Sequence, residues 1–494
     1  MRFSLRHIGF VCGGLLVVFA LVILGKALTV DNRQVAAGSS STVAVDSAAV
    51  GRLAEALQFR TVTKRDPAAL DSAAYEAFYE TLEEAFPRVH TELDTTHVNG
   101  LSRLYTWEGT DSTRAPVVLM GHADVVPIES DSAWTHPPFS GTVSDGYVWG
   151  RGALDDKASV VGILEAVSTL LARDEQPART IHIAIGHDEE VGGARGAQAI
   201  SEQVIDAGPD PALVVDEGGA ITEGALPGLD RPLAVVGVAE KGYLSVELRA
   251  TGEGGHSSAP PEETSIETLN QALSRLLDDP PPARLDGVMG RTLDFVAPQM
   301  SLPMRAALGN RWLTAPAVRW ALNQEPATRA AIRTVQVPTR LSAGVKDNVI
   351  PTSARATVNY RILPSHSVDQ VRQHIESTIG DLPVEVTAGQ TSPPTPVSAM
   401  EDSTFRLMQR TVRQVTSDSV VVAPYLVPGA TDSRYYAEST EHVYRFLPYT
   451  LRPADRGRIH GVDERISVED YKTVVRYYAA LIQNAEALPA STGN

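Results

Sequence analysis

The sequence predicts an α/β fold in which helices flank a mainly parallel sheet, interrupted by a smaller α+β domain with an antiparallel sheet. Three observations lead to this prediction. Short apolar runs alternate with helical patterns through the first half of the chain, which is typical of a parallel sheet with crossover helices. Two longer runs of period two follow, as expected of antiparallel strands. The length of 494 residues also exceeds what one hydrophobic core usually holds.

The composition is that of a globular protein and excludes two classes of function. Hydrophobic residues make up 43% of the chain and charged residues 21%. The formal net charge of -17 would repel the phosphates of nucleic acid, so no nucleic-acid partner is expected. The single cysteine, Cys12, lies near the N-terminus and leaves the main body without a disulfide or a thiol nucleophile. Any metal ion must therefore be held by His, Asp and Glu, the ligands of catalytic zinc sites.

Residues 1–30 are typical of a segment that is directed to a membrane. An uncharged run from Ile8 to Leu24 follows Arg2 and Arg6 and precedes Lys26. Positive charge before an apolar run predicts that the rest of the chain is delivered outside the cytoplasm, on the periplasmic or secreted side.

This segment can be retained as a membrane anchor or removed as a signal peptide. The apolar run is just long enough to span a bilayer, and Gly25-Lys26-Ala27 is a poor cleavage signal. We therefore favour an uncleaved anchor that contacts the membrane, with secretion after signal cleavage as the alternative. Residues 31–47, rich in Ser and Ala towards their end, are interpreted as a flexible tether.

The main body opens with a helical pattern from Ser47 to Phe59, after which strands and helices alternate. Asp156 to Ala172 has apolar residues at helical spacing and is expected to be a crossover helix. Because ligands bind at the carboxyl ends of strands in open α/β sheets, the residues that follow each strand deserve most interest. Three apolar runs lead directly into clusters of His, Asp or Glu: Ala115 to Met120, Thr180 to Ile185, and Ala212 to Val215.

The second half of the chain begins with an inserted domain. Tyr243 to Ala250 and Ala354 to Ile362 alternate with period two and predict an antiparallel sheet, with a helix between them at Ser265 to Leu277. The proline-punctuated stretch from Asp286 to Val335 remains unassigned. A closing helix is predicted to begin at Ser467, where a capping-box pattern starts. The predicted boundaries are 48–236 for the first part of the main domain, 237–366 for the insertion and 367–488 for the second part.

Two clusters of metal-ligand type follow the first strand. His122 and Asp124 are two apart on an extended segment, so that Asp124 can orient the imidazole ring of a metal-binding His122. Asp155 and Asp156 stand in a glycine-rich loop just before the crossover helix, where Asp155 could bridge two cations. The alternative for this pair is structural, with Asp156 capping the helix and Asp155 solvated.

The next clusters complete a set of ligands and a base. Glu189 and Glu190 are adjacent after a strand and leave it in different directions, so that one can bind metal while the other accepts a proton from water. Asp216 ends the following strand, and His460 offers an imidazole far along the chain. Each cluster alone is unremarkable, but a fold has no structural need for such residues at three successive strand ends.

Together these segments resemble the di-zinc metallopeptidase family that includes aminoacylase, glutamate carboxypeptidase, carnosinase and carboxypeptidase S, over roughly Ala48 to Asn484. The resemblance implies a zinc-peptidase-type catalytic domain that holds two Zn²⁺ ions per chain. It implies Asp155 as the bridge between the metals and Glu189 as the catalytic base. The remaining implied ligands are His122 with Asp216 on one zinc ion, and Glu190 with His460 on the other.

The resemblance also implies that the inserted domain is a lid. His256 is similar to a histidine that stabilises the developing oxyanion and that comes from a partner subunit in several relatives, which allows a homodimer through the lid. Asn348 and Arg361 resemble residues near the substrate carboxylate, and Arg434 lies in another matching segment. For Asn348 and Arg361 the alternative is structural, in a turn and on a sheet face.

Within the family, the long lid segment with Leu313, Trp320 and Asn323 is most similar to carboxypeptidase S and to secreted N-fatty-acyl amino acid hydrolases. This implies cleavage of an amide bond beside a free carboxylate, in a small peptide or in an N-acyl amino acid. Trp312 and Trp320 are interpreted as lid core rather than as a lipid-binding feature. An inactive surface binding protein is a further alternative, which we disfavour because no ligand position is missing.

Overall fold

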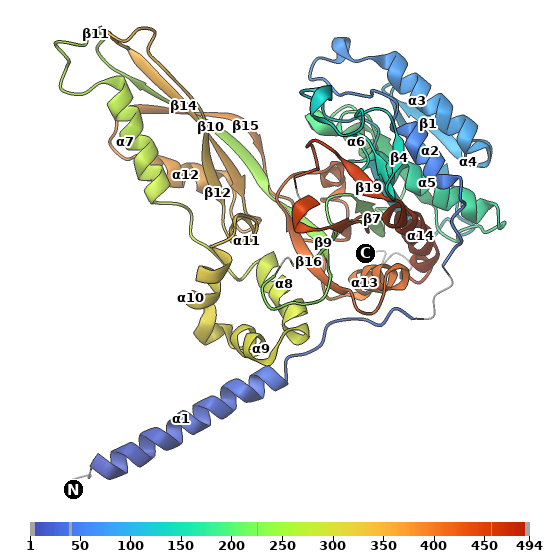
Figure 1. Ribbon diagram of the computed structural model, residues 1–494, viewed down its shortest axis with the longest axis horizontal. Coiled ribbons are helices and arrows are strands. Elements are labelled where there is room, and N and C mark those ends of the chain that lie inside the picture. Colours follow the sequence, from blue (N-terminus) through green and yellow to red (C-terminus); the bar gives the residue numbers. More distant parts are fainter. Residues whose placement is uncertain (1–4, 39–41, 225, 456, 490–494) are drawn as a thin grey trace.

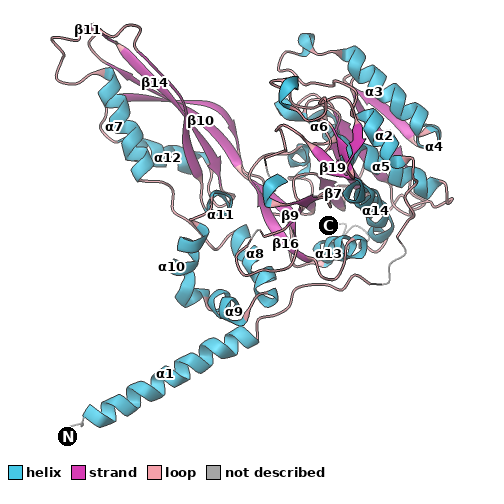
Figure 2. Ribbon diagram, viewed as in Figure 1, coloured by secondary structure: helices cyan, strands magenta, loops and turns pink. Residues whose placement is uncertain are grey.

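The computed structural model describes residues 5–38, 42–224, 226–455 and 457–489. Figure 1 shows two bodies and a projecting N-terminal helix. The larger body, around residues 49–240 and 403–485, corresponds to the expected catalytic domain and is called the catalytic body; the smaller, around residues 242–278 and 335–392, corresponds to the expected lid. The N-terminal helix projects from the end of the molecule that is remote from the tip of the lid. Figure 2 shows that helices lie alongside the strands in both bodies. The predicted α/β class with an antiparallel insertion is confirmed.

A ten-stranded mixed sheet forms the centre of the catalytic body. β3 is parallel to both of its neighbours, with Val117 opposite Ile181 on one side and Leu213 on the other, so three carboxyl ends meet at one edge. The strand order is β1 (Asp94–Val98), β2 (Ser102–Trp107), β6 (Ile181–Gly186), β3 (Val117–His122), β7 (Leu213–Asp216), β17 (Val443–Arg445), β9 (Leu233–Glu240), β8 (Ile221–Thr222) and β18 (Thr450–Leu451), with β16 (Val421–Val427) beside β9.

Helices pack on this sheet and bury its apolar faces. The predicted crossover helix is α5 (Lys157–Leu171), whose residues are nearly all buried. It packs against the closing helix α14 (Val468–Ala485), and Gly162 permits this approach because a Cβ atom there would lie 2.7 Å from Val474 Cγ1. The other helices of this body are α2 (Ala49–Ala56), α3 (Ser72–Ala85), α4 (Pro87–Glu92), α6 (Ala197–Ala207) and α13 (Ser403–Val415).

The lid is an antiparallel sheet covered on one face by two helices. Alternate residues along the central strands are buried, as the period-two pattern predicts. The strand order is β12 (Val335–Ala343), β14 (Ser353–Ile362), β10 (Gly242–Thr251) and β15 (Val384–Ser392), with the helices α7 (Ser265–Asp278) and α12 (Val368–Ile379). The chain thus leaves the lid later than the expected boundary at 367, because β15 pairs with β10.

The proline-punctuated stretch forms four helices between the two bodies: α8 (Val288–Val296), α9 (Leu302–Gly309), α10 (Arg311–Leu322) and α11 (Pro326–Ile332). The interpretation of Trp312 and Trp320 as core is wrong, since these side chains are 60% and 68% exposed. Leu308 and Leu322 fill the interior instead. Helical spacing alone could not tell which face of α10 meets the core.

Helix α1 (Leu5–Leu28) projects from the body beside α9. Across the described residues, no helix is both long enough and apolar enough to cross a membrane. The predicted membrane anchor therefore gains no support, and Arg2, which was part of that prediction, lies outside the described residues.

Candidate metal centre

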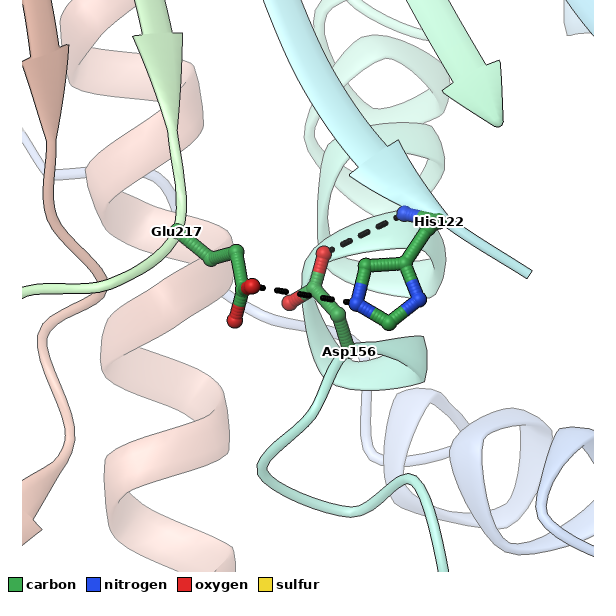
Figure 3. A group of neighbouring side chains, drawn as sticks. All are labelled: His122, Asp156 and Glu217. Atoms are coloured by element: carbon green, nitrogen blue, oxygen red, sulfur yellow. Dashed lines mark hydrogen bonds and ion pairs between the residues drawn. The ribbon is translucent and has the colours of Figure 1, made fainter. Parts of the chain in front are cut away.

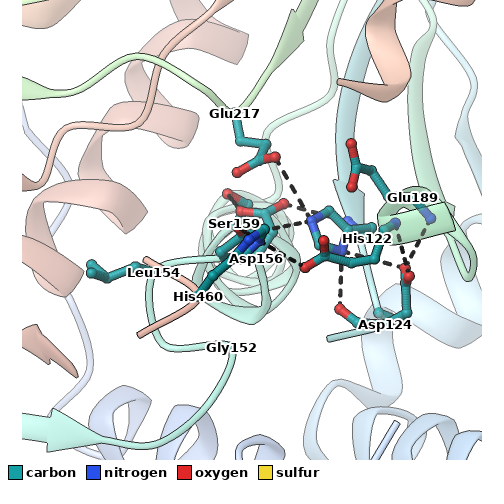
Figure 4. A network of polar contacts seen from close by, with 12 residues as sticks. His122, Asp124, Gly152, Leu154, Asp156, Ser159, Glu189, Glu217 and His460 are labelled. Carbon is teal, nitrogen blue, oxygen red and sulfur yellow. Dashed lines mark hydrogen bonds and ion pairs between the residues drawn. The ribbon is translucent and has the colours of Figure 1, made fainter. Parts of the chain in front are cut away.

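The site begins at the carboxyl end of β3, where Asp124 organises three neighbours (Figure 4). His122 is 1% exposed, and its Nδ1 lies 3.0 Å from the Asp124 carbonyl oxygen and 3.4 Å from its carboxylate. The Asp124 carboxylate also accepts hydrogen bonds from the backbone N–H groups of Glu189 and Glu190, at 3.2 and 3.1 Å. Asp124 therefore orients the imidazole so that Nε2 faces the site, and it holds the two glutamates in place.

Asp155 lies between two imidazoles. Its Oδ1 is 3.0 Å from His122 Nε2 and its Oδ2 is 2.9 Å from His460 Nε2. Glu190 Oε1 lies 3.3 Å from the same nitrogen of His460. Two atoms that bind one tetrahedral zinc ion, each about 2.1 Å from it, lie roughly 3.4 Å apart. The spacing therefore suits two metal ions, with one oxygen of Asp155 on each.

The acidic pair after β7 differs from its predicted arrangement. Glu217 Oε1 lies 3.7 Å from His122 Nε2, whereas both carboxylate oxygens of Asp216 accept backbone hydrogen bonds, from Glu217 at 2.9 Å and from Ser433 at 2.8 Å. Figure 3 shows Glu217 and Asp156 beside His122. Among the residues that the structure describes, three groups of side chains have ligand atoms close enough to share an ion: His122, Asp156 and Glu217; His122, Glu189 and Glu190; and Asp155, Glu190 and His460.

Burial and neighbouring charges shift the ionisation of these groups. Burial raises the pKa of Glu189 well above its usual value and that of Glu217 to about 8. Hydrogen bonds with Asp155 and Glu190 raise the pKa of His460 to about 10. Burial opposes the ionisation of Asp155, but its hydrogen bonds with His122 and His460 lower its pKa below the usual range. So many partly buried carboxylates need a compensating positive charge, which two divalent ions would supply.

Glu464 supports the loop that carries Asp155, a role that the sequence analysis missed. Its fully buried carboxylate accepts hydrogen bonds from the N–H groups of Gly152 at 3.0 Å and Leu154 at 2.8 Å, and pairs with Arg151 at 2.6 Å. Burial raises its pKa to about 7. The segments meet because β5 (Tyr147–Trp149) pairs with β19 (Arg465–Ser467). Only the position of Glu464 four residues after His460 could have hinted at this.

Asp432 is a second buried carboxylate that the sequence analysis missed. It is 3% exposed, and among the described residues neither of its oxygens has a hydrogen-bond partner. Its carboxylate lies against the backbone of Gly193, where an added Cβ atom would be 2.1 Å from Oδ1, and Gly193 has a φ of +66°. The glycine pair Gly192-Gly193, which begins two residues after Glu190, was the available signal, since only glycine permits this approach.

The predicted substrate residues fall into two groups. Arg434 lies beside the site, where its guanidinium donates to the Gly192 carbonyl oxygen at 3.3 Å. His256 lies on β11 (Gly255–His256), which pairs with β13 (Val349–Ile350) at the far tip of the lid in Figure 1. Asn348 precedes β13, and Arg361 lies over the ring of Tyr243 on the lid sheet. Within one chain, the structure brings only Arg434 of these four to the metal ligands.

Comparison with known proteins agrees with this geometry. The profile described as Peptidase family M20/M25/M40 matches residues 118–484. The probable carboxypeptidase S-like 2 of Dictyostelium discoideum is 40% identical over 453 residues, covering 90% of this chain and 87% of the relative. The N-fatty-acyl-amino acid synthase/hydrolase of Mus musculus is 40% identical over 421 residues, covering 84% of each chain. The crystal structure of an M20 family metallo-carboxypeptidase from Sulfolobus solfataricus has the same fold, with a TM-score of 0.66 and 17% identity over 90% of this chain and 100% of that one.

Proposed function

The chain belongs to peptidase family M20/M25/M40, a family of metal-dependent hydrolases. We propose that it uses two zinc ions to cleave an amide bond beside a free carboxylate. The observation that carries the proposal is the position of Asp155, whose two oxygens lie 3.0 and 2.9 Å from the Nε2 atoms of His122 and His460. Zinc is favoured because His, Asp and Glu are the ligands of catalytic zinc sites, and such sites keep a position open for substrate.

We assign the ligands from these distances. His122 and Glu217 would hold one ion, and Glu190 and His460 the other, with Asp155 shared by both. Glu217 replaces the sequence-predicted Asp216 in this proposal because its carboxylate is the one directed at His122. Bound divalent ions would polarise the scissile carbonyl and lower the pKa of a water molecule.

Glu189 is the proposed catalytic base. Its backbone N–H is fixed by Asp124, and its carboxylate belongs to the cluster around His122. The high pKa that burial gives this group favours uptake of a proton from the attacking water. The same carboxyl group then delivers the proton to the leaving nitrogen. Asp124 acts by keeping His122 and Glu189 in position.

Substrate is proposed to bind between the metal centre and the lid. We propose that Arg434, which lies beside the metal ligands, pairs with the substrate carboxylate, and that Asn348 and Arg361 contact this carboxylate from the lid. His256 would stabilise the oxyanion, and its place at the tip of the lid supports its delivery by the second subunit of a homodimer. The edge strand β12 is exposed over most of its length, as an edge that pairs with another copy would be.

Two substrate classes follow from the relatives. A carboxypeptidase would remove the last residue of a small peptide, and an N-fatty-acyl amino acid hydrolase would remove a lipid chain by the same chemistry. The relative named as an N-fatty-acyl-amino acid synthase/hydrolase supports the second class as the alternative. The basic residues before the apolar N-terminal run support a location outside the cytoplasm.

The deciding experiment compares hydrolysis of an N-oleoyl amino acid and of a blocked dipeptide by the zinc-loaded full chain. Preference for the oleoyl substrate would identify a lipid-amino-acid hydrolase, and preference for the dipeptide a carboxypeptidase. Chelator-treated enzyme provides the background, and restored zinc must restore the rate. If the zinc-loaded chain cleaves neither substrate nor an N-acetyl amino acid, the hydrolase proposal fails in favour of a binding protein.

A further inference from the structure

The outer face of α10 carries an apolar stripe that remains largely exposed, although α1 touches it at Trp312. Trp312, Leu313 and Trp320 are 60%, 43% and 68% exposed. Helical spacing places Pro316 and Ala317, which are also exposed, on the same face. Single exposed apolar residues are common on protein surfaces, but a continuous stripe with two tryptophans marks a binding surface.

Helix α1 extends this stripe. The Asn310 side chain donates to the Ile23 carbonyl oxygen at 3.1 Å, and the Phe19 ring meets Trp312 edge-on, with centroids 6.2 Å apart. The Lys26 ammonium lies 5.7 Å from the centroid of Trp312. The neighbouring side chains of α1 are exposed around its circumference: Leu15, Leu16, Val17, Val18, Leu21, Val22 and Leu24. The apolar surface is therefore continuous across both helices.

The charge on this surface indicates what covers it. Residues 295–324 contain no Asp or Glu and three arginines, of which Arg319 is exposed, whereas Arg311 pairs with Asp294 at 2.6 Å and the half-buried Arg305 donates to the Met300 carbonyl oxygen. Arg319 and the exposed Lys26 thus give this surface positive charge in a chain whose net charge is -17. Tryptophan rings and arginine side chains together suit the boundary of a lipid bilayer, where the rings lie at headgroup depth and the guanidinium groups reach the phosphates. A second copy of the chain would bring the same positive charges face to face, which disfavours self-association there.

We propose that α9, α10 and the exposed part of α1 form a docking surface for an anionic lipid bilayer. Docking places α10 in the plane of the membrane interface, with the apolar stripe inward and Arg319 towards the phosphates. Figure 1 shows that the lid sheet and the catalytic sheet lie away from this end of the molecule, so both remain in water. The proposal does not depend on which amide bond the enzyme cleaves.

Tryptophan fluorescence tests the contact directly. The full chain is mixed with phosphatidylglycerol vesicles whose acyl chains are brominated, which quench nearby tryptophans. Trp107 and Trp149 are only 5% exposed, and the half-buried Trp134 lies against Arg151 in the catalytic body. The sequence of α1 contains no tryptophan, so quenching at this surface is expected from the two tryptophans of α10. We expect quenching that is reduced in Trp320→Phe and lost in Trp312→Phe/Trp320→Phe, because phenylalanine keeps the surface apolar. Quenching equal in all three proteins, or absent in all, would overturn the proposal.

Sedimentation with vesicles tests the charge and the occupant. Arg319→Ser should weaken binding to phosphatidylglycerol vesicles about fivefold and leave binding to phosphatidylcholine vesicles unchanged. The matched control is Val143→Ser, which removes a 51% exposed apolar side chain from the catalytic body and should bind like the parent. Equal binding of Trp320→Ser and the control would refute the lipid surface. So would a lipid-free dimer, seen by analytical ultracentrifugation, that Trp320→Ser abolishes.

Discussion

Replacement of Glu217 and of Asp216 by their amides distinguishes which carboxylate binds the metal ion that we propose beside His122. The 3.7 Å between Glu217 Oε1 and His122 Nε2 is close to the roughly 3.4 Å that separates two ligands of one tetrahedral zinc ion. Asp216 instead accepts two backbone hydrogen bonds, so that it acts through the loop that carries Glu217. Loss of such an indirect partner costs about 10- to 100-fold in metal affinity, and loss of a direct ligand costs more.

We therefore expect Glu217→Gln to bind one of its two zinc ions more than about 100-fold more weakly than the parent, and Asp216→Asn to remain within about 100-fold of it. Competition with a chromophoric chelator gives the affinities, and elemental analysis after dialysis gives the number of ions bound. Circular dichroism confirms that both variants are folded. If Asp216→Asn loses one ion while Glu217→Gln keeps two, Asp216 is the ligand and the assignment from distance is refuted.

Three further predictions follow from other parts of the molecule. Glu189→Gln should keep both zinc ions and lower kcat by about 10²- to 10⁴-fold, and near-normal turnover of the metal-loaded variant would exclude Glu189 as the base. Phe405→Ala removes a fully buried ring that packs on Phe295 and Tyr444. It should lower the free energy of unfolding in urea by about 3–5 kcal/mol, whereas Leu341→Ala at an exposed position should change it by less than about 0.5 kcal/mol. Burial lowers the pKa of His182 from 6.5 to about 4, so between these pH values the unfolded chain binds a proton that the folded chain does not. The free energy of unfolding therefore decreases as the pH falls from 6.5 to 4. His182→Gln should remove up to about 3 kcal/mol of that decrease, and an unchanged dependence of stability on pH would contradict the assignment.

The sequence predicts most of the catalytic body because its signals are local. The crossover helix α5 and the strands β3, β6 and β7 lie within two residues of their predicted bounds, since apolar runs and helical spacing record burial directly. Because the carboxyl ends of parallel strands meet at one edge of a sheet, His122, Glu190 and the acidic pair at the end of β7 are expected there together. Those features need no knowledge of distant contacts.

The parts that the sequence did not predict depend on tertiary contacts. Asp216 accepts a hydrogen bond from the N–H of Ser433, which lies far along the chain, whereas Glu217 faces His122, and the local sequence records neither contact. The exposure of Trp312 and Trp320 depends on which face of α10 meets its neighbours, and both faces contain apolar residues. β15 joins the lid through pairing with β10, a contact that its own polar pattern does not record.

The support that Glu464 gives to the Asp155 loop has a consequence for biosynthesis. The N–H of Asp155 is held by a carboxylate that is synthesised 309 residues later, and His460 comes from the same late segment. A growing chain can complete β3, β6 and β7 and still lack both Glu464, which holds the Asp155 loop, and the imidazole of His460. With the proposed ligands, a metal centre that includes both Asp155 and His460 can therefore be complete only after nearly the whole chain has been synthesised.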